Sequence, residues 1–191
     1  MVLVLGPKDV KGLLTIKEAV DAMERGFLDW SNNAWLAELR QRIHSPDGVR
    51  MTVHIGAPDS AGVIGSLLHT EKIAIGEDKR QTYPFRGARV RIVYEGENGG
   101  LLSIQIGELE VEELPGVNQN VVIPTSCATA VGTKWLAKTS SKKIGILGSR
   151  GQARGQLAAV RAAMPGIEEA FVFSPNEDNR NRYAGSMAQI L

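Results

Sequence analysis

The sequence predicts an α/β protein with two parts. Residues 1–124 are expected to form an α+β domain with a mostly antiparallel sheet, and residues 125–191 a partial parallel βαβ domain. In the first part, apolar and polar residues alternate in short runs separated by turn residues, as in antiparallel strands. From residue 125 onward, helical and strand patterns follow one another in turn, which favours a parallel sheet.

Length and composition exclude several classes of protein. A chain of 191 residues is long enough to bury a core, and a net charge of +1 gives no reason to expect a nucleic-acid or membrane partner. Cys127 is the only cysteine, so no internal disulfide is possible. Together these features favour a cytoplasmic protein, and no residue is proposed as a metal ligand.

The N-terminal part is predicted to contain one helix followed by a mostly antiparallel sheet. Residues 15–30 have helical spacing of apolar residues, and Thr15 and Glu18 fit a capping box at the start. Strands are expected at 50–55, 62–70, 88–95 and 100–107. The last two are joined by Gly96-Glu97-Asn98-Gly99, an Asn-Gly turn sequence.

The C-terminal part is predicted to begin after a connection or insertion over 108–124. The expected order is then a helix at 125–138, a strand at 144–148, a helix at 151–164, a strand at 170–174 and a helix from 179 to 191. A doubly wound dinucleotide fold contains two such halves. The chain is therefore expected to be a fragment, although a partner chain that supplies the rest and an unusually short domain remain open alternatives.

A glycine-rich turn in the second part predicts a partial Rossmann-type domain. Gly148 follows an apolar strand, Gly151 lies at the start of a helix, and Arg150 occupies the place of the usual middle glycine. Such a turn lets backbone N–H groups at a helix N-terminus bind the pyrophosphate of NAD or NADP. The alternative is a tight strand-to-helix turn that binds no nucleotide. The predicted cofactor-binding residues here are Gly148, Ser149, Arg150, Gly151, Gln152 and Ala153, with Thr125 at the start of the preceding helix.

The residues after the second strand bear on the choice between NAD and NADP. Ser174 and Asn176, with a nearby arginine (Arg180 or Arg182), could hold a 2′-phosphate. Glu177 or Asp178 could instead bind a free ribose hydroxyl. The sequence leaves both possibilities open.

The chain resembles the ornithine cyclodeaminase/μ-crystallin family. The resemblance is carried by Val4-Leu5, Asp9-Val10 and Leu13–Ala19, by Ala137-Lys138 and Lys143–Arg154, and by Phe173-Ser174-Pro175. It implies a substrate-binding domain that forms a homodimer through its sheet, followed by a nicotinamide-binding domain. It also implies chemistry at the α-carbon of a small amino or imino acid.

The resemblance suggests three further site residues. Arg42 matches an arginine that holds the substrate carboxylate, and an arginine fork suits a carboxylate. The catalytic lysine of the family aligns with Leu67, so that His69 or Lys72 is the expected substitute. A second carboxylate-binding arginine of the family corresponds to the segment Pro124-Thr125, and the family's catalytic aspartate lies in the second half of the nucleotide domain.

Two functional hypotheses follow. The first is an NAD(P)-dependent oxidoreductase or cyclodeaminase-like enzyme that acts on a small amino acid or imine, with activity in the full-length protein and little or none in this chain alone. The second is a nucleotide-binding or dimeric protein on the same scaffold that lacks catalysis. Leu67, Pro124 and Arg150 motivate it, because each departs from the family pattern.

Overall fold

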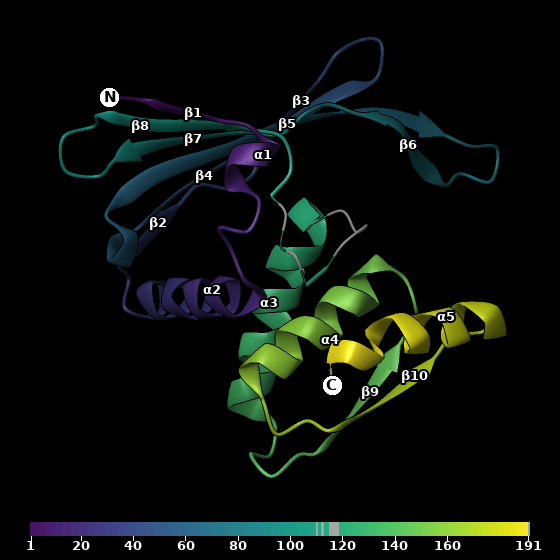
Figure 1. Cartoon of the computed structure of the whole chain (residues 1–191). Coiled ribbons are helices and arrows are strands. Elements are labelled where there is room, and N and C mark those ends of the chain that lie inside the picture. Colours follow the sequence, from purple (N-terminus) through teal and green to yellow (C-terminus); the bar gives the residue numbers. More distant parts are fainter. Residues whose placement is uncertain (110, 112, 115–118, 191) are drawn as a thin grey trace. The chain divides into compact units, whose positions relative to one another are not determined.

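A computed structural model describes residues 1–109, 111, 113–114 and 119–190, which fold into two compact units (Figure 1). Unit 1 comprises Met1–Asp9 and Gly26–Glu108, and unit 2 comprises Val10–Arg25 and Leu109–Leu191. The expected boundary at 124/125 falls inside a helix, because that helix starts earlier than the sequence indicated. Part of the expected 108–124 connection, and the expected helix end at Leu191, lie outside the described residues.

Unit 1 is built on an eight-stranded sheet within the described residues. Its strand order is β1-β8-β7-β5-β4-β2, with β3 added on β4 and β6 on β5; the strands are antiparallel except for the parallel pair β1–β8. The strands are β1 (Leu3–Leu5), β2 (Trp35–Ala37), β3 (Gln41–His44), β4 (Val49–Pro58), β5 (Val63–Ile75), β6 (Gln81–Arg86), β7 (Val90–Glu95) and β8 (Leu101–Ile106). A short helix, α1 (Pro7–Val10), follows β1.

The predicted hairpin is confirmed. Strands β7 and β8 pair in antiparallel register, and the backbone N–H of Glu95 donates to the carbonyl of Gly100 at 2.8 Å. The turn between them is held by Asn98, whose amide donates to the Glu95 carboxylate at 2.6 Å and whose carbonyl accepts from the Gly100 N–H at 2.7 Å. Gly99 has φ +74°, a conformation that favours glycine.

The unit 1 sheet has two chemically different faces. Residues directly opposite one another on paired strands share a face, and alternate residues along a strand also share one. The polar face carries Arg42, Thr52, His54, His69, Glu71, Arg91 and Gln105. The apolar face carries Val53, Ile55, Ile64, Leu68, Ile92 and Ile104.

Helix α2 (Ile16–Ser31) starts with the predicted capping box. The Thr15 N–H donates to the Glu18 carboxylate at 2.9 Å, and the Glu18 N–H donates to the Thr15 hydroxyl at 3.2 Å. Ile16 and Val20 are buried in unit 2, whereas Trp30, at the other end of the helix, is 66% exposed. The predicted apolar stripe is therefore packed only in its first turns.

Unit 2 forms the predicted βαβ arrangement. Strands β9 (Lys143–Leu147) and β10 (Glu169–Phe173) pair in parallel and are connected by α4 (Gly151–Ala163), which Pro165-Gly166 follow. After β10 come α5 (Glu177–Met187) and a short 3₁₀ helix, η2 (Ala188–Ile190). The sheet face away from the core exposes Leu147, Phe171 and Phe173, so the described residues cover only one face of this parallel pair.

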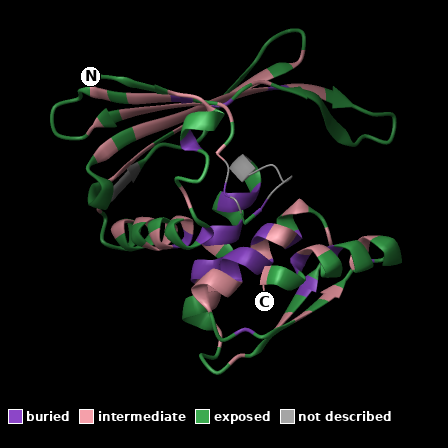
Figure 2. Ribbon diagram, viewed as in Figure 1, coloured by how far each residue is buried: buried purple, intermediate pink, exposed green. Residues whose placement is uncertain are grey.

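The core of unit 2 lies where α3 (Gln119–Leu136) packs on α4, and Figure 2 shows buried residues concentrated on these two helices. A Cβ on Gly155 would lie 2.2 Å from Val122 Cγ1 and 2.4 Å from Ser126 Oγ. Glycine at this position therefore permits the close approach of the two helices. The core includes Ile16, Val20, Val122, Cys127, Ala130, Leu157, Ala159, Tyr183 and Met187.

The start of α3 differs from the prediction. The helix begins at Gln119 rather than at residue 125, and Pro124 lies inside it. Proline is tolerated at a first helical position but costs a backbone hydrogen bond in the interior, which is why the sequence predicted a helix that starts after it. Thr125 directly follows this proline, and its hydroxyl donates to the Val121 carbonyl at 2.9 Å.

Candidate functional site

The predicted glycine turn links β9 to α4. Gly148 has φ +105°, a conformation that L-residues with a side chain rarely adopt. Its N–H donates to the carbonyl of Phe173 at 2.7 Å, which fixes the turn against the end of β10. No atom of the described residues lies within 4 Å of the position that a Cβ would occupy, so this side of the turn is open to a ligand.

Helix α4 presents its first backbone N–H groups at this turn. Arg150 is the N-cap residue, with extended backbone (φ −98°, ψ −168°), and its side chain makes no capping hydrogen bond. Helix N-termini carry unpaired N–H donors and a partial positive charge, which together favour phosphate. The exposed guanidinium of Arg150 adds a full positive charge beside them. The open turn and this charge fit the pyrophosphate of a dinucleotide.

The remaining predicted residues of the turn serve different roles. Gln152 is exposed in the first turn of α4, whereas Ala153 is buried and its carbonyl accepts a hydrogen bond from the Tyr183 hydroxyl at 2.9 Å. Burial raises the pKa of Tyr183 to about 12, so the phenol remains a donor. Ala153 therefore fixes α4 against α5 and keeps the helix start in place.

The end of β10 lies directly beside the glycine turn. The Ser149 hydroxyl donates to the Ser174 hydroxyl at 3.1 Å, and Arg180 Nη1 donates to the Ser174 carbonyl at 2.5 Å. Asn176 caps α5, where its side-chain oxygen accepts from the Asn179 N–H at 2.8 Å. The structure thus brings together the predicted residues of the glycine turn and Ser174, while the Asn176 side-chain oxygen is already used within the fold.

Thr125 is not joined to this cluster. It is exposed on α3, and in the described part of the chain no hydrogen bond links it to the glycine turn. Thr129 and Thr133 repeat its pattern, each hydroxyl donating to the carbonyl four residues earlier. The hydroxyls thus form a series along one side of α3.

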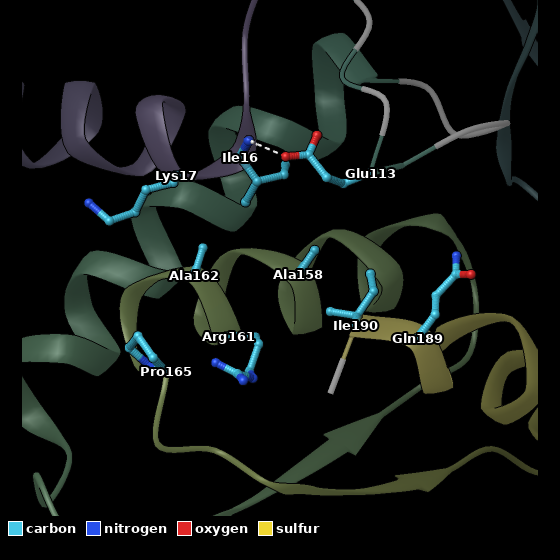
Figure 3. A pocket seen from close by; sticks show the side chains of 9 residues that line it. All are labelled: Ile16, Lys17, Glu113, Ala158, Arg161, Ala162, Pro165, Gln189 and Ile190. Carbon is cyan, nitrogen blue, oxygen red and sulfur yellow. Dashed lines mark hydrogen bonds between the residues drawn. The ribbon is translucent and has the colours of Figure 1, made fainter. Parts of the chain in front are cut away.

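A cavity of about 730 Å³ opens on a different part of unit 2 (Figure 3). Its walls come from four separate segments of the chain, which is why sequence reasoning missed it. The Glu113 carboxylate at its rim accepts a hydrogen bond from the Ile16 N–H at 3.2 Å, and Lys17 pairs with Asp21 at 2.5 Å. The lining residues are Ile16, Lys17, Glu113, Ala158, Arg161, Ala162, Pro165, Gln189 and Ile190.

On the polar face of unit 1, the structure brings His69 into the same cross-strand row as Arg42. Thr52 pairs with both residues, and His69 stacks on His54 with ring centroids 5.9 Å apart. Burial lowers the pKa of His69, and the nearby Arg89 lowers it further. Its Nδ1 atom is buried and has no hydrogen-bond partner within the residues described.

Lys72 does not join this group. It lies an odd number of positions from His69 on β5 and therefore projects from the apolar face. Its Nζ donates to the backbone carbonyl of Asp47. His69 and Lys72 therefore cannot act together on one substrate bound at the polar face.

Two further arginines extend the polar face. Arg89 is 7% exposed and lies 3.4 Å from the Glu108 carboxylate, while Arg91 donates to the Gln105 side-chain oxygen at 2.8 Å and to the Gly107 carbonyl at 3.1 Å. Burial lowers the pKa of Arg91, and the charge of Arg89 adds to this shift. Arg89 and Arg91 alternate with apolar residues in the sequence, a pattern that indicates a basic face of the strand but not the burial of these side chains.

Burial also lowers the pKa of His54, with further contributions from Arg40, Arg42 and Arg89. Several guanidinium groups therefore act on both histidines. Both imidazoles favour the neutral form, and the surrounding positive charge favours an anionic ligand.

No group of three or more His, Cys, Asp or Glu side chains among the described residues is arranged to hold a metal ion. Among the same residues, no helix combines the length and apolar character needed to cross a bilayer.

Fold and site define a class: a protein that joins an antiparallel-sheet unit to a βαβ unit of the dinucleotide-binding type. Residues 118–190 match the sequence model of the ornithine cyclodeaminase/mu-crystallin family, which confirms the resemblance for this part of the chain. A search of curated proteins found no match.

Solved structures share the fold over nearly the whole chain. The Δ1-pyrroline-2-carboxylate reductase of Thermococcus litoralis, in complex with NADH and L-proline, has 23% identity and a TM-score of 0.72, and the match covers 99% of this chain and 55% of that one. An archaeal alanine dehydrogenase dimer with bound NAD has 19% identity and a TM-score of 0.74, covering 98% and 53%. The iminosuccinate reductase of Paracoccus denitrificans in complex with NAD⁺ has 18% identity and a TM-score of 0.72, covering 99% and 54%.

The chain spans about half the length of these solved structures, at 53–55% of each. Their similarity confirms the predicted fold class, with its mostly antiparallel sheet followed by parallel strands. The bound nicotinamide cofactors and the bound L-proline were observed in those solved structures.

Proposed function

We propose that this chain carries the dinucleotide-binding turn and part of the substrate-binding surface of an NAD(P)-dependent oxidoreductase or cyclodeaminase-like enzyme acting on a small amino or imino acid. The observation that carries the proposal is the turn at Gly148, with its positive φ, its open side and the start of α4 beside it. Neighbouring structures with NADH or NAD⁺ bound support the same assignment.

In this proposal the cofactor, when bound, supplies or accepts a hydride at its nicotinamide ring. The chain's own residues bind and orient it: backbone N–H groups at the start of α4 and the guanidinium of Arg150 hold the pyrophosphate. Ser149 and Ser174 lie at the adjacent strand end, where a Rossmann-type domain binds the adenosine ribose.

The polar face of unit 1 is proposed to bind the substrate carboxylate. Arg42 is exposed on β3 and supplies a planar fork that suits a carboxylate, while Arg89 and Arg91 raise the positive potential of the same face. The lowered pKa of His69 keeps its imidazole neutral near pH 7, so it can accept a proton from a substrate ammonium group. Lys72, on the opposite face, is the weaker candidate for this role.

The apolar face of the same sheet is proposed as a homodimer interface. Ile55 is 44% exposed and Ile64 is 41% exposed, in the central strands of the sheet rather than at its edges. An extended apolar sheet face of this kind normally packs against another surface. Analytical ultracentrifugation should show a dimer, and Ile64→Glu should shift it to a monomer.

We also propose a cytoplasmic location for the protein. Cys127, the only cysteine, is fully buried, and burial raises the pKa of its thiol to about 11, which keeps it protonated and unreactive. Fractionation of cells that produce the native protein tests this proposal. Recovery of the protein in a secreted fraction would refute the cytoplasmic location.

The experiment that tests the function is a fluorescence titration of the 191-residue chain with NADPH and with NADH. The proposal predicts saturable binding of at least one cofactor, and an absence of binding for both would refute it. A spectrophotometric assay of the native gene product against keto acids with amines then separates the enzyme from the alternative. Cofactor binding without any turnover would favour the non-catalytic protein.

A further inference from the structure

The residues at the C-terminal end of β10 bear on whether the cofactor is NAD or NADP. In Rossmann-type domains an acidic residue at the end of the second strand accepts hydrogen bonds from the ribose hydroxyls of NAD, while an arginine nearby accommodates the 2′-phosphate of NADP. Here β10 ends at Phe173, and the residue that follows it is Ser174, a buried hydroxyl. This position therefore lacks the carboxylate that favours NAD.

A guanidinium is fixed at the same place. Arg180 Nη1 donates to the Ser174 carbonyl at 2.5 Å, so the positive charge of Arg180 is held against the strand end. A guanidinium has five N–H donors, and this bond uses one of them. Within the described residues no carboxylate forms an ion pair with Arg180, although Glu177 and Asp178 are close in sequence.

The acidic residues of this segment begin the helix that follows β10. Glu177 and Asp178 are exposed in the first turn of α5, where negative charges are stabilised by the helix dipole. Asn176 uses its side-chain oxygen to cap the same helix. The side chains that hydrogen-bond at the strand end beside the glycine turn are those of Ser149 and Arg180, which contact the hydroxyl and the carbonyl of Ser174.

We propose that Ser174 and Arg180 form a 2′-phosphate subsite that selects NADP(H) over NAD(H). This inference rests on the proposed dinucleotide-binding function and goes beyond it by naming the form of the cofactor. A phosphate ester offers charged acceptor oxygens to both side chains, whereas a free ribose hydroxyl offers no charge to Arg180.

The test uses adenosine ligands, since they report on this subsite without the nicotinamide ring. Isothermal titration calorimetry of the 191-residue chain compares adenosine 2′,5′-bisphosphate with 5′-AMP. A hydrogen bond to a charged group corresponds to about a tenfold or larger gain in affinity. We expect the bisphosphate to bind at least about tenfold more tightly.

Two variants examine the residues separately. Ser174→Asp places a carboxylate at the strand end, so it should weaken the bisphosphate about tenfold or more and strengthen 5′-AMP, whose ribose hydroxyls can donate to that carboxylate. Arg180→Gln removes the charge and should weaken the bisphosphate about tenfold more than it weakens 5′-AMP. A merely structural role of Arg180 would weaken both ligands equally. Arg182→Gln, an exposed arginine on the same helix, is the matched control and should change neither affinity.

The outcomes separate this inference from the broader function. Equal affinities for the two ligands, or tighter binding of 5′-AMP, would overturn the 2′-phosphate subsite while leaving dinucleotide binding intact. Equal losses of both ligands in Arg180→Gln would overturn the role of Arg180. Failure of both ligands to bind, together with failure of NADPH and NADH, would overturn the proposed function itself.

Discussion

Replacing Gly148 with alanine should destabilise unit 2 and abolish cofactor binding. At φ +105° an alanine occupies a strained backbone conformation, which costs about 1–3 kcal/mol. Steric overlap adds nothing to this cost, because no atom lies within 4 Å of the new Cβ. The free energy of unfolding, measured by urea denaturation followed by circular dichroism, should fall by that amount. The new methyl group would also project into the open side of the turn, so NADPH fluorescence titration should show a loss of binding.

Gly145→Ala is the matched control. Gly145 lies on β9 of the same unit, its φ is not positive, and a Cβ there also meets nothing within 4 Å. Alanine at this position should leave the unfolding free energy within about 0.5 kcal/mol of the wild type. If Gly148→Ala were as stable as Gly145→Ala and bound NADPH with the same affinity, neither the positive φ of Gly148 nor the open side of the turn would have the role assigned to it.

Three further predictions concern packing, titration and capping. Gly155→Val should lower the unfolding free energy by at least about 1–3 kcal/mol, because its side chain would overlap Val122 and Ser126; unchanged thermal stability would contradict the close contact of α3 and α4. The lowered pKa of His69 means that the folded state disfavours the charged imidazole, so stability should fall as the pH drops below about 6.5, and His69→Gln should reduce this dependence in unfolding measured from pH 8 to pH 5.5. An identical pH profile for both proteins would count against that assignment. Asn176→Ala should cost about 0.5–2 kcal/mol through loss of the cap of α5, measurable by thermal unfolding, and a neutral effect would argue against the cap.

The strongly patterned elements could be predicted from the sequence. The capping box at Thr15, the Asn-Gly hairpin turn and the Gly148 turn each follow from local chemistry that does not depend on distant residues. The end of α4 just before Pro165-Gly166 likewise follows from local chemistry. The parallel pairing of β9 with β10 was predicted instead from the alternation of strands and helices along the chain.

The remaining elements depend on partners that a local pattern does not show. All residues of β3 and β6 are exposed, and these strands pair with β4 and β5. Because neither face of these two strands is buried, their sequences show no alternation of apolar and polar residues. The start of α3 was missed because Pro124 normally marks a helix beginning, whereas here it lies in the second turn.

The candidate site was predictable only in part, for a geometric reason. The Gly148 turn is contiguous in sequence, but the contact of Ser149 with Ser174 depends on the pairing of two strands. The separation of His69 from Lys72 follows from the period of two along β5, once the register of that strand is known. The burial of Arg89 likewise could not be read from its position beside a strand.

Binding of a dinucleotide at the β9–α4 turn can be followed residue by residue in an NMR titration of the ¹⁵N-labelled chain with NADPH. We expect saturable shifts of the backbone amides of Gly148, Arg150 and Gly151, with Ser174 affected next. Amides of the unit 1 hairpin, such as Gly99, serve as the internal reference and should not shift. An absence of saturable shifts at the turn, or shifts confined to other residues, would show that this turn does not bind the dinucleotide.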